Sequence, residues 1–221
     1  MSDSPVEKTP IIKLEGLSIV LSDQLIIKDA SFSIDHGDFI YIIGENGSGT
    51  TTLVRAILGL IPIKSGKITV CKKHALIGYL PQESNLDPNF PATVEEIVST
   101  GNLGKMRLRP FYKSAEKSAT KNAMKLLRID SLAKKKFVNL SGGQKQKTLL
   151  ARALTSSPDI LILDEPSNNL DAVSRKDIYH ALETLSEQGQ TILLITHDPE
   201  RLNLRHSKTI EIKDKVTHVY A

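Results

Sequence analysis

The sequence contains no tryptophan and one cysteine, Cys71, and aromatic residues make up 5% of its 221 residues. A single cysteine has no partner for an intrachain disulfide, which fits the reducing cytoplasm. No apolar run approaches the roughly 18 to 20 residues of a membrane-spanning helix. The first residues also lack the basic and then apolar layout of a signal peptide. We therefore expect a cytoplasmic protein that would serve a membrane only as a peripheral subunit.

The scarcity of aromatic residues also bears on nucleic acid as a partner. Lys and Arg outnumber Asp and Glu by 29 to 25, which gives a net charge of +4. These basic residues form no stripe with interleaved aromatic side chains, the pattern of a base-stacking surface. We expect no nucleic acid partner. The hydrophobic content of 40% and charged content of 24% are ordinary for a globular protein of this length.

Short apolar runs predict a parallel α/β sheet. The runs at residues 39–43, 160–163 and 191–195 are each bounded by polar residues or glycine. Runs of this kind are typical of strands buried on both faces. Residues 174–185, between the last two runs, keep the apolar spacing of a helix. Functional sites in such sheets lie at the carboxyl ends of the strands, where polar residues follow each run here.

Two other parts of the chain differ from this pattern. Residues 11–34 are predicted to form short strands separated by turns, an N-terminal antiparallel β part. Residues 91–157 are helical and charged, and their first helix is expected to begin with a capping box of Thr93 and Glu96. We predict one domain over residues 1–221, with a core of about 1–90 and 158–221 and an inserted helical subdomain of about 91–157.

A glycine-rich segment follows the first buried run. It reads Gly44-Glu45-Asn46-Gly47-Ser48-Gly49-Thr50-Thr51-Thr52. Residues 53–60 then keep helical spacing. Glycines allow backbone N–H groups to converge on phosphate oxygens, and the helix N-terminus adds a favourable dipole. A strand, such a loop and a helix are the required context of a phosphate-binding loop, in which Thr51 is expected to coordinate Mg²⁺.

One position of this loop departs from the pattern. Thr50 stands where a lysine is expected before the Ser or Thr. The lysine ammonium normally bridges the β- and γ-phosphates, and losing one preorganised donor typically costs on the order of 10²–10³ in rate. Thr50 is short and neutral. Arg55 is the nearest cation in sequence, but it lies about one helical turn beyond the loop, and we do not expect it to substitute. A glycine-rich turn without a ligand is the alternative.

Acidic and basic side chains follow the other two buried runs. Asp164 can hold Mg²⁺, directly or through water, and Glu165 can polarise an attacking water. An acidic pair after a strand is otherwise a plain turn. His197 is placed to contact a γ-phosphate, although an isolated histidine is more often structural.

A second glycine-containing segment precedes a helix that includes residues 147–154. It reads Leu140-Ser141-Gly142-Gly143-Gln144. A Ser and two glycines at a helix start leave N–H groups free to bind an anion. The same residues also fit a plain N-cap, and the pattern alone does not separate the two interpretations.

Together these motifs resemble those of the nucleotide-binding subunits of ABC transporters, over essentially the whole chain. Residues 140–144 are identical to that family's signature sequence, and Gln82 matches its Q-loop glutamine. Asp171 lies in a segment that resembles the D-loop, and His197 matches the switch histidine. The resemblance implies a P-loop NTPase (RecA-like) core that binds ATP and Mg²⁺. It also implies that Gln82 joins Thr51 and Asp164 at the Mg²⁺ ion and acts with Glu165 and His197 in hydrolysis.

The resemblance further implies partners. In the family, two subunits pack head to tail, and each ATP lies between one phosphate loop and the other subunit's signature. Ser141 and Gly143 would then act across the interface of a homodimer. A transmembrane permease and, for an importer, a substrate-binding protein are the other implied partners. The subunit would lie on the inner face of the cell membrane.

A second departure from the family concerns the adenine base. Alignment places Leu21 where the family usually stacks an aromatic side chain, so apolar contact remains while π-stacking is lost. Residues 89–98 and the compact C-terminus are similar to the ATPases of zinc and manganese importers. We therefore expect a divalent metal ion as the transported substrate, with a non-metal substrate as the alternative.

Three kinds of function are weighed for this chain. One is an ATP-driven transport subunit, and another is a nucleotide-binding module that regulates or assembles a complex without hydrolysis. The third, a soluble protein of nucleic-acid repair or translation, usually carries two cassettes or long insertions, which are missing here. Glu165, His197, Gln82, Ser141 and Gly143 are all present, and only the lysine is lost. This pattern favours a transport ATPase whose turnover is impaired by Thr50.

Overall fold

The computed structural model describes residues 10–70, 75–82, 90–106, 109–197 and 207–220, so Cys71 lies outside the described residues. The strands are β1 (Pro10–Leu21), β2 (Gln24–Asp35), β3 (Phe39–Gly44), β4 (Ser65–Val70), β5 (Ile77–Leu80), β6 (Ile160–Asp164), β7 (Thr191–Ile195), β8 (Ser207–Lys213) and β9 (Val216–Tyr220). The α-helices are α1 (Thr50–Ile57), α2 (Val94–Ser99), α3 (Leu103–Met106), α4 (Ser114–Leu126), α5 (Gly142–Thr155) and α6 (Ala172–Glu187). Short 3₁₀ turns are η1 (Thr100–Asn102), η2 (Asp130–Leu132) and η3 (Phe137–Asn139).

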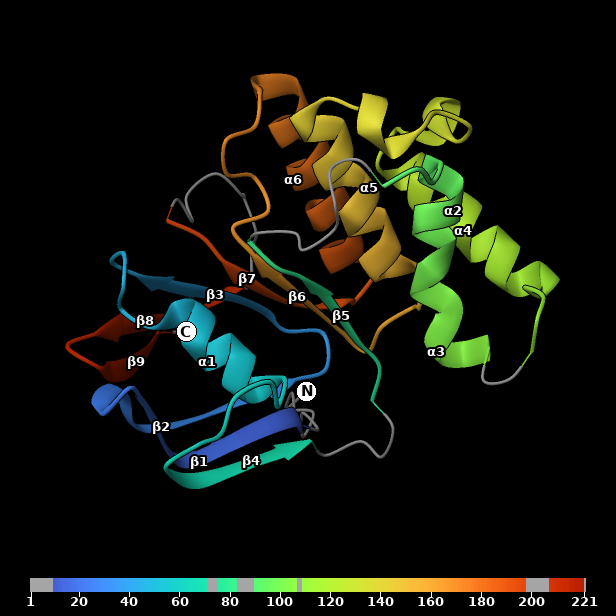
Figure 1. Cartoon of the computed structure of the whole chain (residues 1–221). Helices are drawn as coiled ribbons and strands as arrows, with labels where there is room; N and C mark the ends of the chain where they lie inside the picture. The colour runs from blue at the N-terminus through green and yellow to red at the C-terminus, as the bar shows by residue number, and fades with distance from the viewer. Residues whose placement is uncertain (1–9, 71–74, 83–89, 107–108, 198–206, 221) are drawn as a thin grey trace, which may run out of the picture.

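The described strands form two sheets. The larger sheet has the order β5-β6-β7-β3-β8-β9, and the smaller has the order β2-β1-β4 (Figure 1). All pairs of the larger sheet are parallel except the hairpin of β8 and β9. Both pairs of the smaller sheet are antiparallel. The chain therefore has an α/β fold with an antiparallel N-terminal part and a layer of helices, as the sequence predicts.

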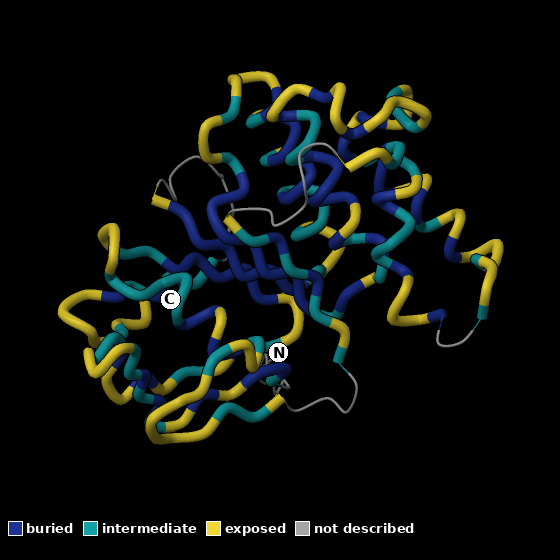
Figure 2. The backbone as a smooth tube through the Cα atoms, viewed as in Figure 1, coloured by how far each residue is buried: buried dark blue, intermediate teal, exposed yellow. Residues whose placement is uncertain are grey.

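Alternate residues of the central strands face two separate hydrophobic cores. On β6, Leu161 and Leu163 join the core formed with the helical layer. Ile160 and Ile162 of the same strand join the core formed with β1, β2 and α1. Figure 2 shows these strands as the buried centre of the molecule. Burial on both faces explains why these strands are almost continuous apolar runs in the sequence.

Two long strands replace the short N-terminal strands that the sequence predicts, and that prediction was wrong in detail. The register between β1 and β2 shifts between Leu14 and Leu17 without ending either strand. Gly16, with φ 59°, lies at this shift, and Asp29, with φ 50°, lies at the next shift, between Leu17 and Ile19. Both residues have left-handed conformations. A β-bulge and a turn are difficult to distinguish in the sequence, because both use residue types that adopt left-handed conformations.

The predicted helix after the glycine-rich loop is shorter than expected. The helix α1 ends at Ile57, and Leu60 lies beyond it with a relative exposure of 63%. Gly59, with φ 69°, turns the chain out of the helix, a common role of glycine just past a helix end. The predicted capping box at α2 is confirmed, since Glu96 N donates to Thr93 Oγ1 and Thr93 N donates to a Glu96 carboxylate oxygen.

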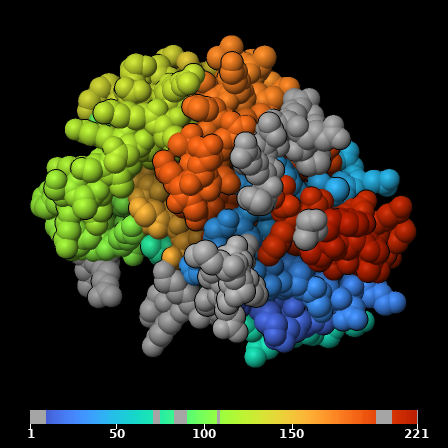
Figure 3. Space-filling view, turned by 180° about the vertical axis from the view of Figure 1, so that it is seen from behind, coloured from blue at the N-terminus to red at the C-terminus, as the bar shows by residue number. Residues whose placement is uncertain are grey.

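The helical layer lies on one side of the larger sheet. Seen from behind, residues of about 91–140 gather on one side of the molecule, and the β8–β9 hairpin and the N-terminal strands lie on the other (Figure 3). The helices α2, α4 and α5 pack against each other and against the sheet through the first core. No helix among the described residues has the length and apolar character needed to cross a membrane.

Candidate nucleotide site

The glycine-rich loop connects the end of β3 to the start of α1, as the sequence predicts. Ser48 N donates to Glu45 O at 2.9 Å, and Leu53 N donates to Gly49 O at 2.8 Å. The N–H groups of the first residues of α1 have no partner within the helix, as at every helix start. The first turn of α1 contains no acidic residue that would compete for them. The loop and helix start therefore form a potential anion site.

Glycine is required at both ends of this loop. A Cβ at Gly44 would lie 2.3 Å from Ser48 Oγ, and one at Gly49 would lie 2.6 Å from Ile26 Cγ2. Gly49 also has φ 102°, a left-handed conformation that favours glycine. The side chain of Ile26, on β2, thus lies directly against the loop. Ile26 was not predicted from the sequence, because the contact joins segments that only the fold brings together.

Asp164 ends β6 with a buried carboxylate close to Thr51. Asp164 is 1% exposed, and neither of its carboxylate oxygens has a hydrogen-bond partner of good geometry among the described residues. Burial raises the pKa of Asp164, while the nearby Thr51 hydroxyl and the charges of Arg55 and His197 lower it. A buried acceptor pair without donors is costly unless another group, such as a cation, compensates.

Glu165 follows in a strained conformation. Its φ is 50°, which is uncommon for a residue other than glycine, and its N–H donates to Ile195 O at 3.1 Å. That bond ties the end of β6 to the end of β7, where His197 follows. The Nε2 atom of His197 lies 2.9 Å from Glu165 Oε1, although the contact lacks the angles of a hydrogen bond. Strained residues of this kind are concentrated at functional sites.

The pKa of Glu165 is raised from its ordinary value. Burial is the main cause, and the neighbouring charge of Asp164 adds to it. His197 acts in the opposite direction and favours the ionised carboxylate. A glutamate with a raised pKa and a histidine within reach has the character of a general base.

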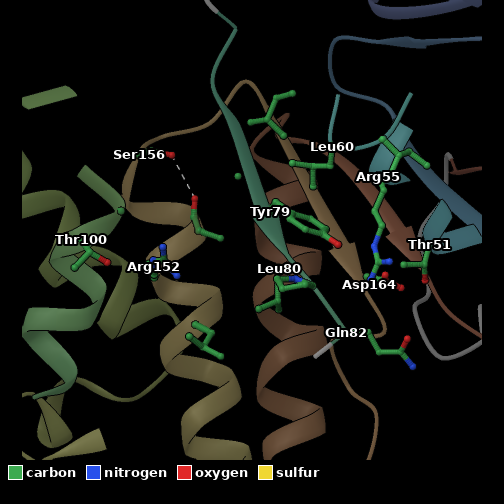
Figure 4. A pocket seen from close by; sticks show the side chains of 17 residues that line it. Thr51, Arg55, Leu60, Tyr79, Leu80, Gln82, Thr100, Arg152, Ser156 and Asp164 are labelled. Carbon is green, nitrogen blue, oxygen red and sulfur yellow. Dashed lines mark hydrogen bonds between the residues drawn. The ribbon is translucent and has the colours of Figure 1, made fainter. Parts of the chain in front are cut away.

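Gln82 lies just after β5 and shares an open cavity with the two predicted Mg²⁺ ligands. The cavity has a volume of about 1130 Å³, and Thr51, Asp164 and Gln82 lie together at one end of it (Figure 4). Arg55 of α1 and Tyr79 of β5 line the same end. Neither of these two residues was given a role on the basis of the sequence. The spacing of four residues between Thr51 and Arg55 could have indicated that both side chains share one face of α1.

The residues near Thr51 fit a hard divalent cation. Mg²⁺ takes oxygen ligands, and the site offers the Thr51 hydroxyl, the Asp164 carboxylate and the Gln82 side-chain oxygen. The partnerless oxygens of Asp164 are the observation that favours this interpretation, since a bound cation would compensate their burial. Thr50, one residue earlier, contributes only a half-buried neutral side chain.

The residues 141–144 lie at a different place in the chain's structure. They begin α5 in the helical layer, well separated from α1 in Figure 1. Ser141 Oγ accepts from Gln144 N, and Gln144 Oε1 accepts from Ser141 N, which completes a capping box. The N-cap is thus confirmed, whereas anion binding by this segment stays a prediction. Gly142 is exposed, and an added Cβ there would meet no neighbour. Within one chain this segment and the phosphate loop do not meet.

Asp171 caps α6 next to the start of α5. Its carboxylate accepts from Ser174 N and from Ser174 Oγ, both at 2.8 Å, and these bonds lower the pKa of Asp171. A Cβ at Gly143 would lie 2.1 Å from Ser174 Oγ, so only glycine fits there without displacement. Leu21, predicted to lie against the adenine, is half-buried and ends β1 opposite Gln24, beside the turn that joins β1 to β2.

A phosphate-binding loop, an acidic pair and a histidine at the carboxyl edge of a parallel sheet define a nucleotide-binding protein of the P-loop class. A sequence model of the ABC transporter family matches residues 27–168. The chain is 35% identical to a manganese transport system ATP-binding protein of Bacillus subtilis over 85% of this chain and 77% of that protein. It is also 35% identical to a zinc import ATP-binding protein of Histophilus somni, over 86% of this chain and 68% of that protein.

Solved structures show the same similarity. A bacterial ABC transporter cassette solved as a dimer is 26% identical with a TM-score of 0.79, and covers 95% of this chain and 97% of its own. A subunit of an ABC transporter complex from Clostridium perfringens is 29% identical with a TM-score of 0.79, and covers 96% of this chain and 88% of its own. The chain belongs to the ABC transporter family and is an ATP-binding subunit.

Proposed function

We propose that this subunit binds Mg²⁺ and ATP at the phosphate loop and couples ATP hydrolysis to the import of a divalent metal ion. The observation that carries the proposal is the meeting of Thr51, Asp164, Glu165 and His197 at one edge of the sheet. We further propose that Thr50 slows this hydrolysis severely without abolishing nucleotide binding.

Each part of the site has a distinct task in this proposal. The free N–H groups of the loop and of the start of α1 bind the phosphates. Thr51, Asp164 and Gln82 hold the Mg²⁺ ion, which when bound neutralises charge on the phosphates. Glu165 orients an attacking water and accepts its proton, because burial raises its pKa toward that of an effective base. His197 positions the Glu165 carboxylate and reaches toward the γ-phosphate.

The choice of metal ion as the transported substrate rests on the relatives. Their names refer to manganese transport in Bacillus subtilis and to zinc in Histophilus somni and Streptococcus pneumoniae, at 32–35% identity. We propose the same class of cargo for this chain, recognised by partner subunits. A transmembrane permease, a substrate-binding protein and a second copy of this subunit complete the proposed assembly on the inner face of the membrane.

Two further expectations belong to this proposal. The core of about 1–90 and 158–221 and the helical subdomain of about 91–157 are proposed as two parts of one domain. Leu21 is expected to contact the adenine, with lower base preference than an aromatic side chain would give.

The test compares the chain that carries Thr50 with the Thr50→Lys variant. We expect both to bind ATP in the presence of Mg²⁺, as measured by fluorescence of a labelled nucleotide. Steady-state phosphate release should rise on the order of 10²–10³-fold in Thr50→Lys, because the lysine restores a preorganised cation at the transferred phosphoryl group. Thr51→Ala in both backgrounds is the control, since it removes the proposed Mg²⁺ ligand and should abolish the gain.

Equal and robust turnover in the two chains would contradict the assigned role of Thr50. Turnover in neither chain, measured with the permease present and with nucleotide binding retained, would favour the regulatory module that does not hydrolyse ATP. The identity of the cargo is tested separately, by zinc and manganese uptake in cells that carry the complete transporter.

A further inference from the structure

The side chain of Arg55 reaches back toward the predicted Mg²⁺ ligands. Arg55 lies in the last turn of α1, one turn after Thr51 on the same face of the helix. In Figure 4 its side chain runs along the cavity wall toward Asp164 and Thr51. Its position in the sequence suggested that it lies too far from the loop to matter. The length of an arginine side chain shortens that separation.

The charge of Arg55 lowers the pKa values of two neighbouring groups, Tyr79 and Asp164. Burial and the Asp164 charge raise the pKa of Tyr79, and Arg55 opposes them through its charge and a hydrogen bond. Arg55 likewise opposes the rise that burial causes in the pKa of Asp164. Arg55 is thus a permanently charged group close to a carboxylate whose oxygens lack hydrogen-bond partners of good geometry.

We propose that Arg55, which lines the cavity beside Asp164 and Thr51, supplies part of the positive charge missing at Thr50 and makes ATP binding less dependent on Mg²⁺. The inference rests on the proposed nucleotide site. Without Arg55, metal-free ATP would meet the negative charges of Asp164 and Glu165 with less compensation. Loss of Arg55 would also remove a positive charge that repels bound Mg²⁺. Both effects increase the advantage of ATP with Mg²⁺ over ATP alone.

The experiment measures the affinity of the full chain for a fluorescent ATP analogue in excess MgCl₂ and in excess EDTA. The readout is the ratio of the dissociation constant in EDTA to that in MgCl₂. We expect Arg55→Gln to raise this ratio about tenfold, the effect of about one pKa unit of differential interaction. Arg55→Lys should stay within about twofold of the natural chain, because it keeps the charge, and Arg55→Glu should exceed Arg55→Gln.

The matched control is Arg152→Gln. Arg152 lines the same cavity from α5, so its loss removes the same charge from the opposite wall. We expect it to leave the ratio unchanged. Arg55 is exposed, so the variants should fold, and thermal melting verifies this.

Three results would overturn the inference. One is an unchanged ratio in both Arg55→Gln and Arg55→Glu, and another is an equal change in Arg152→Gln. The third is weakening of both affinities by the same factor, which indicates a merely structural role. Failure of the natural chain to bind the analogue in either condition would instead contradict the proposed nucleotide site itself.

Discussion

Tyr41 carries a hydroxyl that the fold buries without a hydrogen-bond partner among the described residues. Its ring packs against Phe39 in the core under the helical layer, with centroids 5.1 Å apart. Burial raises the pKa of Tyr41 to about 12, and the nearby Tyr179 and Glu183 add to the effect. The ring therefore stabilises the core, whereas its hydroxyl does not.

We expect Tyr41→Phe to raise the free energy of unfolding by about 1 kcal/mol at neutral pH, because the variant no longer buries an unpaired polar group. The difference should grow as the pH rises from about 10 to about 12. In that window the natural tyrosine ionises in the unfolded chain but stays protonated in the folded one, so the natural protein loses stability. Urea denaturation across this range measures both effects. A variant less stable than the natural chain would show that Tyr41 has a polar partner.

The positions of single site residues were predictable from the sequence where those residues belong to a motif. Thr51, Asp164 and His197 fall where the loop and the strand ends predict, because strand and helix boundaries follow from apolar patterns. Arg55 and Ile26 were not predictable in this way. Their contacts with the site depend on the reach of one side chain and on the packing of β2 against Gly49, which no local pattern encodes.

At the scale of elements, the starts of α5 and α6 pack against each other through a glycine. Gly143 lies so close to Ser174 that an added Cβ would be 2.1 Å from its Oγ and 2.5 Å from its Cβ. The same hydroxyl donates to Asp171, the N-cap of α6. Any side chain at Gly143 must therefore displace the cap of the neighbouring helix.

Gly143→Ala is expected to lower the free energy of unfolding by about 1–3 kcal/mol through this overpacking. The neighbouring Gly142→Ala is the matched control, since nothing lies within 4 Å of the place where its new methyl group would sit, and it should change stability by no more than about 0.5 kcal/mol. Thermal or urea unfolding measures the two variants side by side. Equal effects at both positions would mean that helix propensity, and not the contact with Ser174, determines the change in the free energy of unfolding.

Helices that begin with a capping residue were predicted well, whereas strands that contain a bulge were predicted poorly. The capping box at Thr93 was predicted and is present, and the N-cap considered at Ser141 proves to be a capping box as well. The sequence analysis predicted turns between short strands in this part of the chain, whereas Gly16 lies at a bulge within β1, and glycine permits a left-handed conformation in either setting. The pairing of β1 with β4 resumes at Ser18 after its own register shift next to Gly16, and that pairing is not local in sequence.

At the scale of the whole molecule, β6 links the two hydrophobic cores and ends at the site. Its residues alternate between the core of the helical layer and the core of the N-terminal strands. Asp164 and Glu165 are therefore held by a strand fixed on both faces, whereas residues 141–144 belong to the helical layer alone. Rigid support of this kind suits groups that must hold a fixed geometry.

The phosphate loop and residues 141–144, the two proposed nucleotide contacts, lie apart within one chain. A second copy of the chain is therefore needed to bring them to the same nucleotide. The exposed Gly142 offers a way to block that second copy, because its surroundings are open and a large side chain should fit without disturbing the fold. We expect Glu165→Gln, which removes the proposed base, to become a dimer with ATP and Mg²⁺ in light scattering after size exclusion. Glu165→Gln with Gly142→Arg should bind ATP yet stay monomeric, since the arginine would project into the partner. Dimers of equal stability in both variants would place the interface elsewhere and contradict the head-to-tail arrangement.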